Sequence, residues 1–444
     1  MKRQTNAILA LLLTAVLATS ATFAGTLPKS SPEDVGLSAE RLQRITDAMK
    51  ADVTNGNISG AVALVARKGK IAYLEVDGMA DKEKGVPMKA DTIFRIYSMS
   101  KPITSVAVMM LFEEGKFFLD DPVSKYIPEL GGLKVIVEQE TKDGAVFNLP
   151  EEDPAKQPAK ATSLADITTE AAHRDMTIHD LLRHTSGLTY GFFGNSEVDQ
   201  IYQQMGILTT DKDLADMCQK LSKIPLKHHP GEVWEYSISV DVLGRLVEVL
   251  SGQPFDKFLQ ERIFDPLGMV DTSFAVPNDK LGRFAQMYTP DPQTKIKPAP
   301  AFYSRNFVGN PTFFSGGGGL CSTATDYFRF CQTMLNGGEL DGVRILGRKT
   351  VELMASNHTY EVPMSLGGDT GYAFGLGFAV AQEPGRIGVP VSVGEFNWGG
   401  AAGTKFWIDP KEDFIGIYMV QILPHTGLHY GDTFKNLAYQ TIAD

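Results

Sequence analysis

Residues 98–115 have the sequence SMSKPITSVAVMMLFEEG, which carries the clearest structural signal in the chain. Gly115 ends a pattern of helical period, so this stretch is predicted to be a helix. The period is set by four apolar side chains, those of Val106, Met109, Met110 and Leu111. Almost every residue after Lys101 is apolar, which predicts a largely buried helix. A lysine at the start of such a helix would be drawn into the interior, where its charge is costly.

Ser98 and Lys101 are three residues apart, which places both side chains on one face of the predicted helix and within reach of each other. A serine hydroxyl is a poor nucleophile until a base takes its proton, and a desolvated lysine can be neutral and do so. The helix N-terminus adds free N–H groups where an oxyanion would develop. Ser-x-x-Lys alone occurs on many surface helices. The apolar residues that follow favour Ser98 as a nucleophile and Lys101 as its base.

Two further segments have the residue types of a site. Tyr236 lies in the loop GEVWEYSI before an amphipathic pattern, where a tyrosinate beside a lysine ammonium could relay protons. Trp398, Gly399 and Gly400 precede a predicted strand, and glycines at a strand edge let a ligand or another backbone approach closely. Taken alone, Tyr236 is better explained as an ordinary packed tyrosine, and the two glycines can also be explained as a bulge or a tight turn.

Other catalytic chemistries lack their motifs. No Gly-x-Ser-x-Gly occurs, so the nucleophile elbow of α/β-hydrolases is absent. Neither the pair His179 and His184 nor the adjacent His228 and His229 has the spacing or a thiolate partner of a zinc site. The run of glycines at 316–319 is not followed by Lys-Ser/Thr and is predicted to be a structural turn. We therefore expect neither a metal nor a cofactor.

The order of predicted elements indicates an α/β (α+β) fold. An antiparallel hairpin is predicted over residues 61–80, helices dominate the middle of the chain, and strands return from about residue 373. The two ends are thus expected to build one sheet, with a mostly helical domain inserted between them. The expected sheet domain comprises residues 25–120 and 300–444, and the helical domain residues 121–299, with a charged, Pro-rich surface insertion near 138–170.

The composition and the amino-terminal residues indicate where the protein is located and which partners it is not expected to bind. The 444-residue chain is 43% hydrophobic with a formal charge of −11 and no long run of one sign, so nucleic-acid partners are not expected. Lys2 and Arg3 precede an apolar run and small residues up to Ala24, which predicts a signal peptide over residues 1–24. The apolar run is too short to favour a retained membrane anchor. We expect export to the periplasm or the medium, with no stable membrane insertion after cleavage. Nothing in the sequence fixes the oligomeric state.

Five segments in order resemble the serine β-lactamase-related family, which includes class C β-lactamases, D-Ala-D-Ala peptidases and family-VIII carboxylesterases. The segments, which lie within a resemblance from about residue 37 to the C-terminus, are FRIYSMSKPITSVAVMML, HDLLRHTSGL, YSISVDVLGRLVEVLSG, GGGGLCSTATDYFRF and FNWGGAAGTKFWIDP. The resemblance implies a β-lactamase/transpeptidase-like fold, an antiparallel sheet flanked by helices beside a helical domain, with the active site between them.

The resemblance also implies residue roles. Ser98 matches the family nucleophile, Lys101 its lysine partner and Tyr236 the tyrosine of the second motif. Trp398, with Gly399 and Gly400, falls where β-lactamases carry Lys-Thr-Gly, in contact with substrate. The backbone N–H groups of Ser98 and Ala401 would then form the oxyanion hole.

Two departures from the family pattern concern the substrate. The second motif is Tyr-Ser-Ile in place of Tyr-x-Asn, and Trp398 replaces the lysine that would face a carboxylate. Both losses favour small neutral esters, as in the family-VIII esterases. A β-lactamase or D-amino-acid peptidase is the alternative, with Lys405 as a replacement cation. A non-catalytic penicillin-binding-type module is a third possibility, which the complete set of Ser98, Lys101 and Tyr236 argues against.

Overall fold

The computed structural model describes residues 27–444 apart from 138–166, 209–211, 304–306, 363, 365–369 and 426. The signal peptide predicted over residues 1–24 and most of the insertion predicted near 138–170 lie outside the described residues. Among the residues that are described, no helix is both long and apolar enough to cross a membrane.

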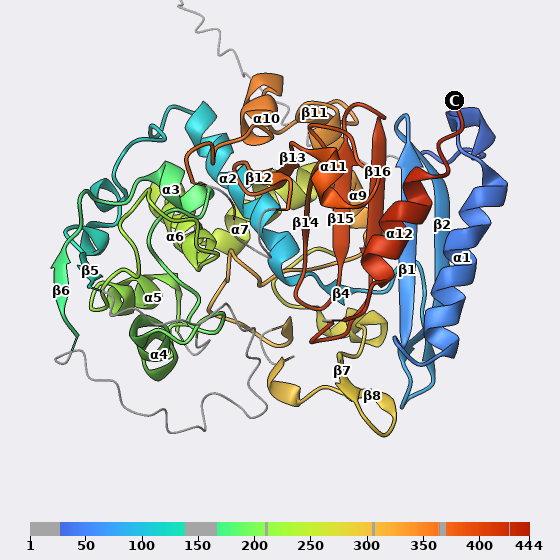
Figure 1. The fold of residues 1–444 in the computed structure, drawn as a ribbon, viewed down its shortest axis with the longest axis horizontal. Helices are drawn as coiled ribbons and strands as arrows, with labels where there is room; N and C mark the ends of the chain where they lie inside the picture. Colours follow the sequence, from blue (N-terminus) through green and yellow to red (C-terminus); the bar gives the residue numbers. More distant parts are fainter. Residues whose placement is uncertain are drawn as a thin grey trace, which may run out of the picture.

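An eight-stranded antiparallel sheet joins the two ends of the chain (Figure 1). The hairpin predicted over 61–80 forms two of its strands, and β1 pairs with β16 so that Leu64 lies opposite Ile417. In spatial order the strands are β12 (Tyr372–Phe374), β13 (Ala379–Ala381), β14 (Phe396–Gly399), β15 (Lys405–Asp409), β16 (Phe414–Met419), β1 (Gly60–Arg67), β2 (Lys70–Asp81) and β3 (Val86–Pro87). The predicted fold class is confirmed.

Helices cover both faces of this sheet. α1 (Ala39–Thr54) and α12 (Tyr430–Tyr439) pack on one face, and α2 (Ser100–Glu113) and α9 (Ala324–Leu335) on the other. Side chains alternate between the faces along each strand, so the neighbours Phe406 and Trp407 belong to different hydrophobic clusters. This alternation decides which residues of β14 and β15 can reach the site.

A helical region lies beside the sheet, to its left in Figure 1. Its helices are α3 (Ile178–Leu182), α4 (Glu197–Gln204), α5 (Leu214–Leu221), α6 (Ser239–Ser251), α7 (Phe255–Leu259) and α8 (Asp265–Leu267). α2 packs against α6 and α7, and one hydrophobic cluster runs from the sheet through α2 into this region. Buried α2 is therefore the element that connects the two parts.

Short elements complete the fold. Within the part of the chain that the structure describes, four pairs of short strands lie outside the main sheet, each strand two to four residues long, and two short helices flank the C-terminal strands. They are β4 (Phe94–Arg95) with β9 (Cys321–Ser322), β5 (Lys134–Ile136) with β6 (Thr169–Ala171), β7 (Tyr288–Asp291) with β8 (Lys295–Pro298), β10 (Glu339–Leu340) with β11 (Val343–Arg344), α10 (Arg348–Met354) and α11 (Pro384–Ile387). The three cysteines are buried and unpaired.

Candidate active site

Ser98 lies in a single 3₁₀ turn, Tyr97–Met99, that runs directly into α2. Its side chain is half-buried, whereas almost all of α2 is buried. Tyr97, immediately before it, has a φ of 41°, in the left-handed region that a non-glycine residue rarely adopts. Such strain is found where the surrounding structure holds a functional residue in place. The strained turn presents the Ser98 hydroxyl beside the start of the helix.

Lys101 is fully buried, and its amine contacts three oxygens. Its Nζ lies 3.2 Å from Ser98 Oγ and donates hydrogen bonds to the Gly317 carbonyl at 2.6 Å and to the Tyr190 hydroxyl at 2.7 Å. A carbonyl oxygen can only accept, and the Tyr190 hydroxyl can accept as well. A neutral amine that donates its two hydrogens to these partners directs its remaining lone pair toward Ser98. The geometry therefore suits a base that removes the proton of Ser98.

The protonation of Lys101 depends on burial and on one carboxylate. Burial lowers the pKa of Lys101 to about 7, and the nearby charge of Asp241 opposes this effect. Asp241 lies in the first turn of α6 and is itself buried, which raises the pKa of its carboxyl. At neutral pH a substantial fraction of Lys101 is therefore neutral and able to accept a proton.

The Asp241 carboxylate holds the turn that contacts Lys101. Its Oδ1 accepts hydrogen bonds from the Ser315 hydroxyl and the Gly317 N–H, while Oδ2 has no partner within the described residues. A Cβ at Gly317 would lie 2.5 Å from Asp241 Oδ2 and 2.8 Å from the Tyr190 hydroxyl, so a side chain there would displace both groups. The same peptide thus binds Asp241 through its N–H and lies against Lys101 through its carbonyl.

Tyr236 lies on the other side of Ser98. Its hydroxyl accepts a hydrogen bond from the indole N–H of Trp398 at 3.2 Å and is also hydrogen-bonded to Ser98. Burial raises the pKa of the Tyr236 phenol, which favours the protonated form. Lys101 Nζ lies 4.5 Å from the centre of the Tyr236 ring, where an ammonium is stabilised by the aromatic face. These contacts suit a phenol that passes a proton while Lys101 holds the charge.

The glycines after Trp398 bring a tight turn against the segment that leads to Ser98. The Gly400 N–H donates to the Thr404 carbonyl at 2.8 Å, and the Gly403 N–H donates to the Gly400 carbonyl at 2.9 Å. A side chain on Gly400 would collide with the Ile96 carbonyl, which explains the glycine. Among the described residues, neither the N–H of Ser98 nor that of Ala401 has an acceptor. Both groups are thus available for an oxyanion.

Aromatic rings surround Tyr236. Trp398 is half-buried and packs against both Tyr236 and Phe374, with ring centres 5.5 and 5.3 Å apart. His184 packs against Tyr236 from within the core, and burial together with the charge of Lys101 lowers its pKa, so this imidazole is neutral. The wall of the site beside Trp398 is therefore apolar and uncharged.

Lys405, the alternative cation, is directed away from this wall. It belongs to the same face of β15 as Trp407, the face covered by α12, and its Nζ forms an ion pair with Asp432 at 2.6 Å. Trp398 lies opposite Phe406, whose side chain is on the other face. The alternation left open by the sequence thus places Lys405 outside the candidate site.

Tyr190, Gly317 and Asp241 are residues of the site that were not predicted from the sequence. Gly317 belongs to the glycine run that was predicted to be only a structural turn, and its carbonyl contacts Lys101. Tyr190 follows the segment HTSGL, and Asp241 follows Tyr236 on α6. A buried lysine needs hydrogen-bond acceptors, so the burial predicted for Lys101 indicates that such partners exist. It does not indicate where in the sequence they lie.

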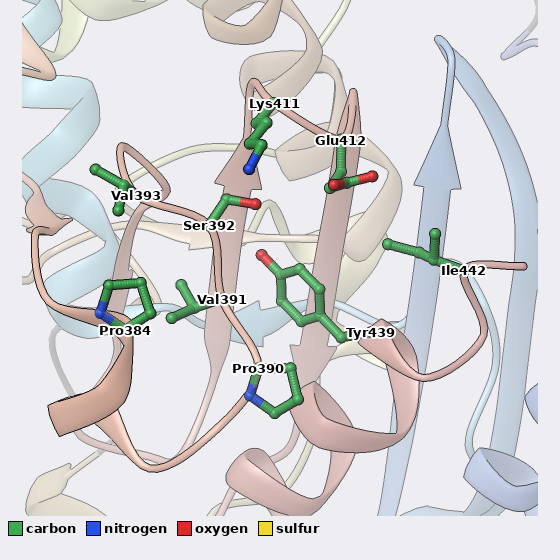
Figure 2. A pocket seen from close by; sticks show the side chains of 9 residues that line it. All are labelled: Pro384, Pro390, Val391, Ser392, Val393, Lys411, Glu412, Tyr439 and Ile442. Carbon is green, nitrogen blue, oxygen red and sulfur yellow. The ribbon is translucent and has the colours of Figure 1, made fainter. Parts of the chain in front are cut away.

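A separate hollow of about 370 Å³ lies beside the C-terminal strands and is not part of this site. Figure 2 shows it between the ring of Tyr439 and the segment that carries Pro390 and Val391, with Lys411 near its edge. None of the residues predicted for the site lines it.

Comparisons with known proteins agree with the fold and identify a family. A family model described as Beta-lactamase matches residues 44–440. An uncharacterized protein of Mycobacterium tuberculosis is 36% identical over 378 residues, covering 83% of this chain and 87% of its own length. The esterase EstB of Burkholderia gladioli is 30% identical over 401 residues, covering 86% of this chain and 90% of its own.

A solved structure supports the same fold. Simvastatin synthase (LovD) from Aspergillus terreus superposes with a TM-score of 0.74 and 22% sequence identity, over 90% of this chain and 98% of the other. At this level of identity the likeness concerns the fold alone.

Proposed function

The chain belongs to the beta-lactamase family, and on that basis we propose that it is a serine esterase that cleaves small neutral esters through an acyl-enzyme on Ser98. The observation that carries the proposal is the buried Lys101 amine, 3.2 Å from Ser98 Oγ, with its other contacts made to Gly317 and Tyr190. This arrangement leaves a lone pair facing the nucleophile.

The proposed reaction has two halves. Lys101 takes the Ser98 proton as Oγ bonds to the ester carbonyl carbon, and the N–H groups of Ser98 and Ala401 stabilise the oxyanion. When the intermediate collapses, the bond to the alcohol oxygen breaks, and Tyr236 donates a proton to the leaving alcohol and is reprotonated by Lys101. A water molecule then attacks the acyl carbon and gives a proton to Lys101. The bond between the acyl carbon and Oγ breaks, the acid leaves, and Lys101 returns the proton to Oγ, which restores the Ser98 hydroxyl.

The preference for esters over β-lactams rests on the wall at Trp398. An indole occupies the position where a cation would face a carboxylate, and Lys405 is held by Asp432 on the other face of the sheet. An anionic substrate would lose its water there without gaining a counter-charge. The 30% identity to a bacterial esterase adds support.

Parallel assays test this function. The purified chain is incubated with p-nitrophenyl butyrate and with nitrocefin under the same conditions. We expect turnover of the ester and a much lower kcat/KM for the β-lactam. A nitrocefin rate comparable to the ester rate would overturn the ester preference, and stable acylation of Ser98 without turnover would support a binding module.

The pH dependence tests Lys101 as the base. Because the neutral amine is the active form, kcat/KM should rise about tenfold per pH unit below pH 7 and level off above the Lys101 pKa of about 7. Asp241→Asn removes the charge that raises this pKa, so the acid limb should move to lower pH. Asp326→Asn, at another buried carboxyl, is the matched control and should leave the limb in place. An unchanged limb in Asp241→Asn would refute the coupling.

Trp398→Lys tests the wall of the site. It removes the indole N–H that binds the Tyr236 hydroxyl and adds a cation, so kcat/KM for p-nitrophenyl butyrate should fall about tenfold while acylation by nitrocefin increases. Trp398→Phe keeps an aromatic wall without the N–H and should give no gain on nitrocefin. A rise in ester turnover with no gain on any β-lactam would show that Trp398 does not line the substrate.

We also propose that the chain is exported, because residues 1–24 combine two basic residues with an apolar run and small residues. Edman sequencing of protein from a native periplasmic or secreted fraction should begin near residue 25. Intact protein confined to the cytoplasm would contradict it.

A further inference from the structure

Two His and Glu pairs from distant parts of the sequence, Glu170 with His173 and His229 with Glu232, meet in the helical region, and none of the four residues belongs to the candidate active site. The ring of His173 stacks on that of His229, with centres 3.7 Å apart and planes 6° apart. His173 Nδ1 lies 2.7 Å from Glu232 Oε1, and His229 Nε2 lies 3.1 Å from Glu170 Oε1. One ligand atom each of His173, His229 and Glu232 lie within 4.8 Å of one another.

The hydrogen bonds assign different roles to the two carboxylates. His229 Nδ1 accepts a bond from the His173 backbone N–H at 3.3 Å, so in the neutral ring the proton is on Nε2 and is donated to Glu170. A histidine that donates one ring N–H to a carboxylate and turns its other nitrogen toward the ion has the arrangement that supports metal ligands in proteins, and His229 would reach it by giving up the long bond to Nδ1. His229 Nδ1 is thus one nitrogen that can turn to a cation beside the Glu232 carboxylate, and His173 Nδ1, which donates its proton to Glu232, becomes a second one when that proton is released.

We propose that His173, His229 and Glu232 bind a divalent transition-metal ion such as Zn²⁺, with Glu170 orienting His229. Two imidazoles and one carboxylate, with a water as fourth ligand, match the nitrogen and oxygen donors that Zn²⁺ takes. Binding needs the stacked rings to tilt, His229 Nδ1 to exchange its long hydrogen bond for the metal, and His173 Nδ1 to release to solvent the proton that it donates to Glu232. His173 is exposed and can make this adjustment.

The proposed metal site would join two segments that are distant in the sequence. His173 and Glu170 lie on or just after β6, while His229 and Glu232 belong to the loop that leads to Tyr236. That loop is already tied to the HTSGL segment, since the Gly231 N–H donates to the Thr185 carbonyl at 2.7 Å. A bound ion would therefore stabilise the loop that leads to Tyr236, although the ion itself would lie outside the active site. His173 and His229 are 56 residues apart in the sequence, so no local spacing indicates that they meet.

Titration calorimetry on chelator-treated, tag-free protein tests the proposal. We expect one Zn²⁺ per chain, a melting temperature that rises with Zn²⁺, and visible absorption bands of a low-symmetry site when Co²⁺ is used instead. His173→Ala should abolish saturable binding, and Glu170→Gln should weaken it about 10-fold or more.

His429→Ala, at an exposed histidine near the start of α12, is the matched control and should bind as the wild type does. Because His173 is exposed, its alanine variant should fold normally, which circular dichroism checks. No saturable binding by wild-type protein, or equal losses in His173→Ala and His429→Ala, would overturn the proposal.

Discussion

Ser98→Ala should lower kcat/KM for p-nitrophenyl butyrate by about 10³-fold or more, because it removes the oxygen that forms the acyl-enzyme. The half-buried Ser98 side chain contacts Lys101 and Tyr236, both of which keep other partners. The variant should therefore fold as the wild type does, and thermal unfolding provides that check. The loss of activity would then report chemistry and not stability.

Mass spectrometry gives an independent readout of the same change. A fluorophosphonate should add one label to the wild type and none to Ser98→Ala. Ser186→Ala is a matched control, since the Ser186 hydroxyl is buried and shares a 2.7 Å hydrogen bond with Ser239. Wild-type turnover in Ser98→Ala, or labelling that persists in it, would show that another residue is the nucleophile.

Local patterns in the sequence were enough to predict much of the fold. The hairpin near 61–80 and the buried helix after Ser98 are each encoded by neighbouring residues, through alternation in one and helical spacing in the other. The pairing of β1 with β16 joins residues more than 300 apart, and it was inferred only from the order of elements and the family resemblance. Strand periodicity also left the direction of Lys405 open, because one residue of register reverses the face.

The residues of the candidate site also fall into two groups, those that local spacing predicts and those that only the packing of distant segments brings together. Ser98 and Lys101 are close because a helix turn makes them so, whereas Tyr190 and Gly317 are 89 and 216 residues from Lys101 along the chain. Their contacts exist only once α2 packs between the sheet and the helical region. Asp241 lies in the first turn of a helix, where an acidic residue is common on the surface for its favourable dipole interaction. Nothing local distinguishes it from such a residue, although it is buried beside Lys101.

Two tyrosines contact the Ser98 and Lys101 pair, and their phenylalanine variants should differ. Burial raises the pKa of both phenols, so both are proton donors or hydrogen-bond acceptors and not tyrosinates at neutral pH. Tyr236→Phe removes the group placed to protonate the leaving alcohol, and kcat should fall about 10²- to 10⁴-fold. Tyr190→Phe removes one acceptor of Lys101 but not the proton path, and a loss of about tenfold is expected.

The leaving group makes this comparison sharper. p-Nitrophenolate leaves without a proton, whereas ethanol needs one, so Tyr236→Phe should lower the acylation rate for ethyl butyrate more than that for p-nitrophenyl butyrate. Tyr190→Phe should lower both rates by similar factors, because orienting the Lys101 lone pair helps the attack on either ester. Single-turnover kinetics with each ester separate acylation from hydrolysis of the acyl-enzyme. If Tyr190→Phe shows the dependence on leaving group and Tyr236→Phe does not, the proton donor is Tyr190, and the phenol held by Trp398 serves only to position Ser98.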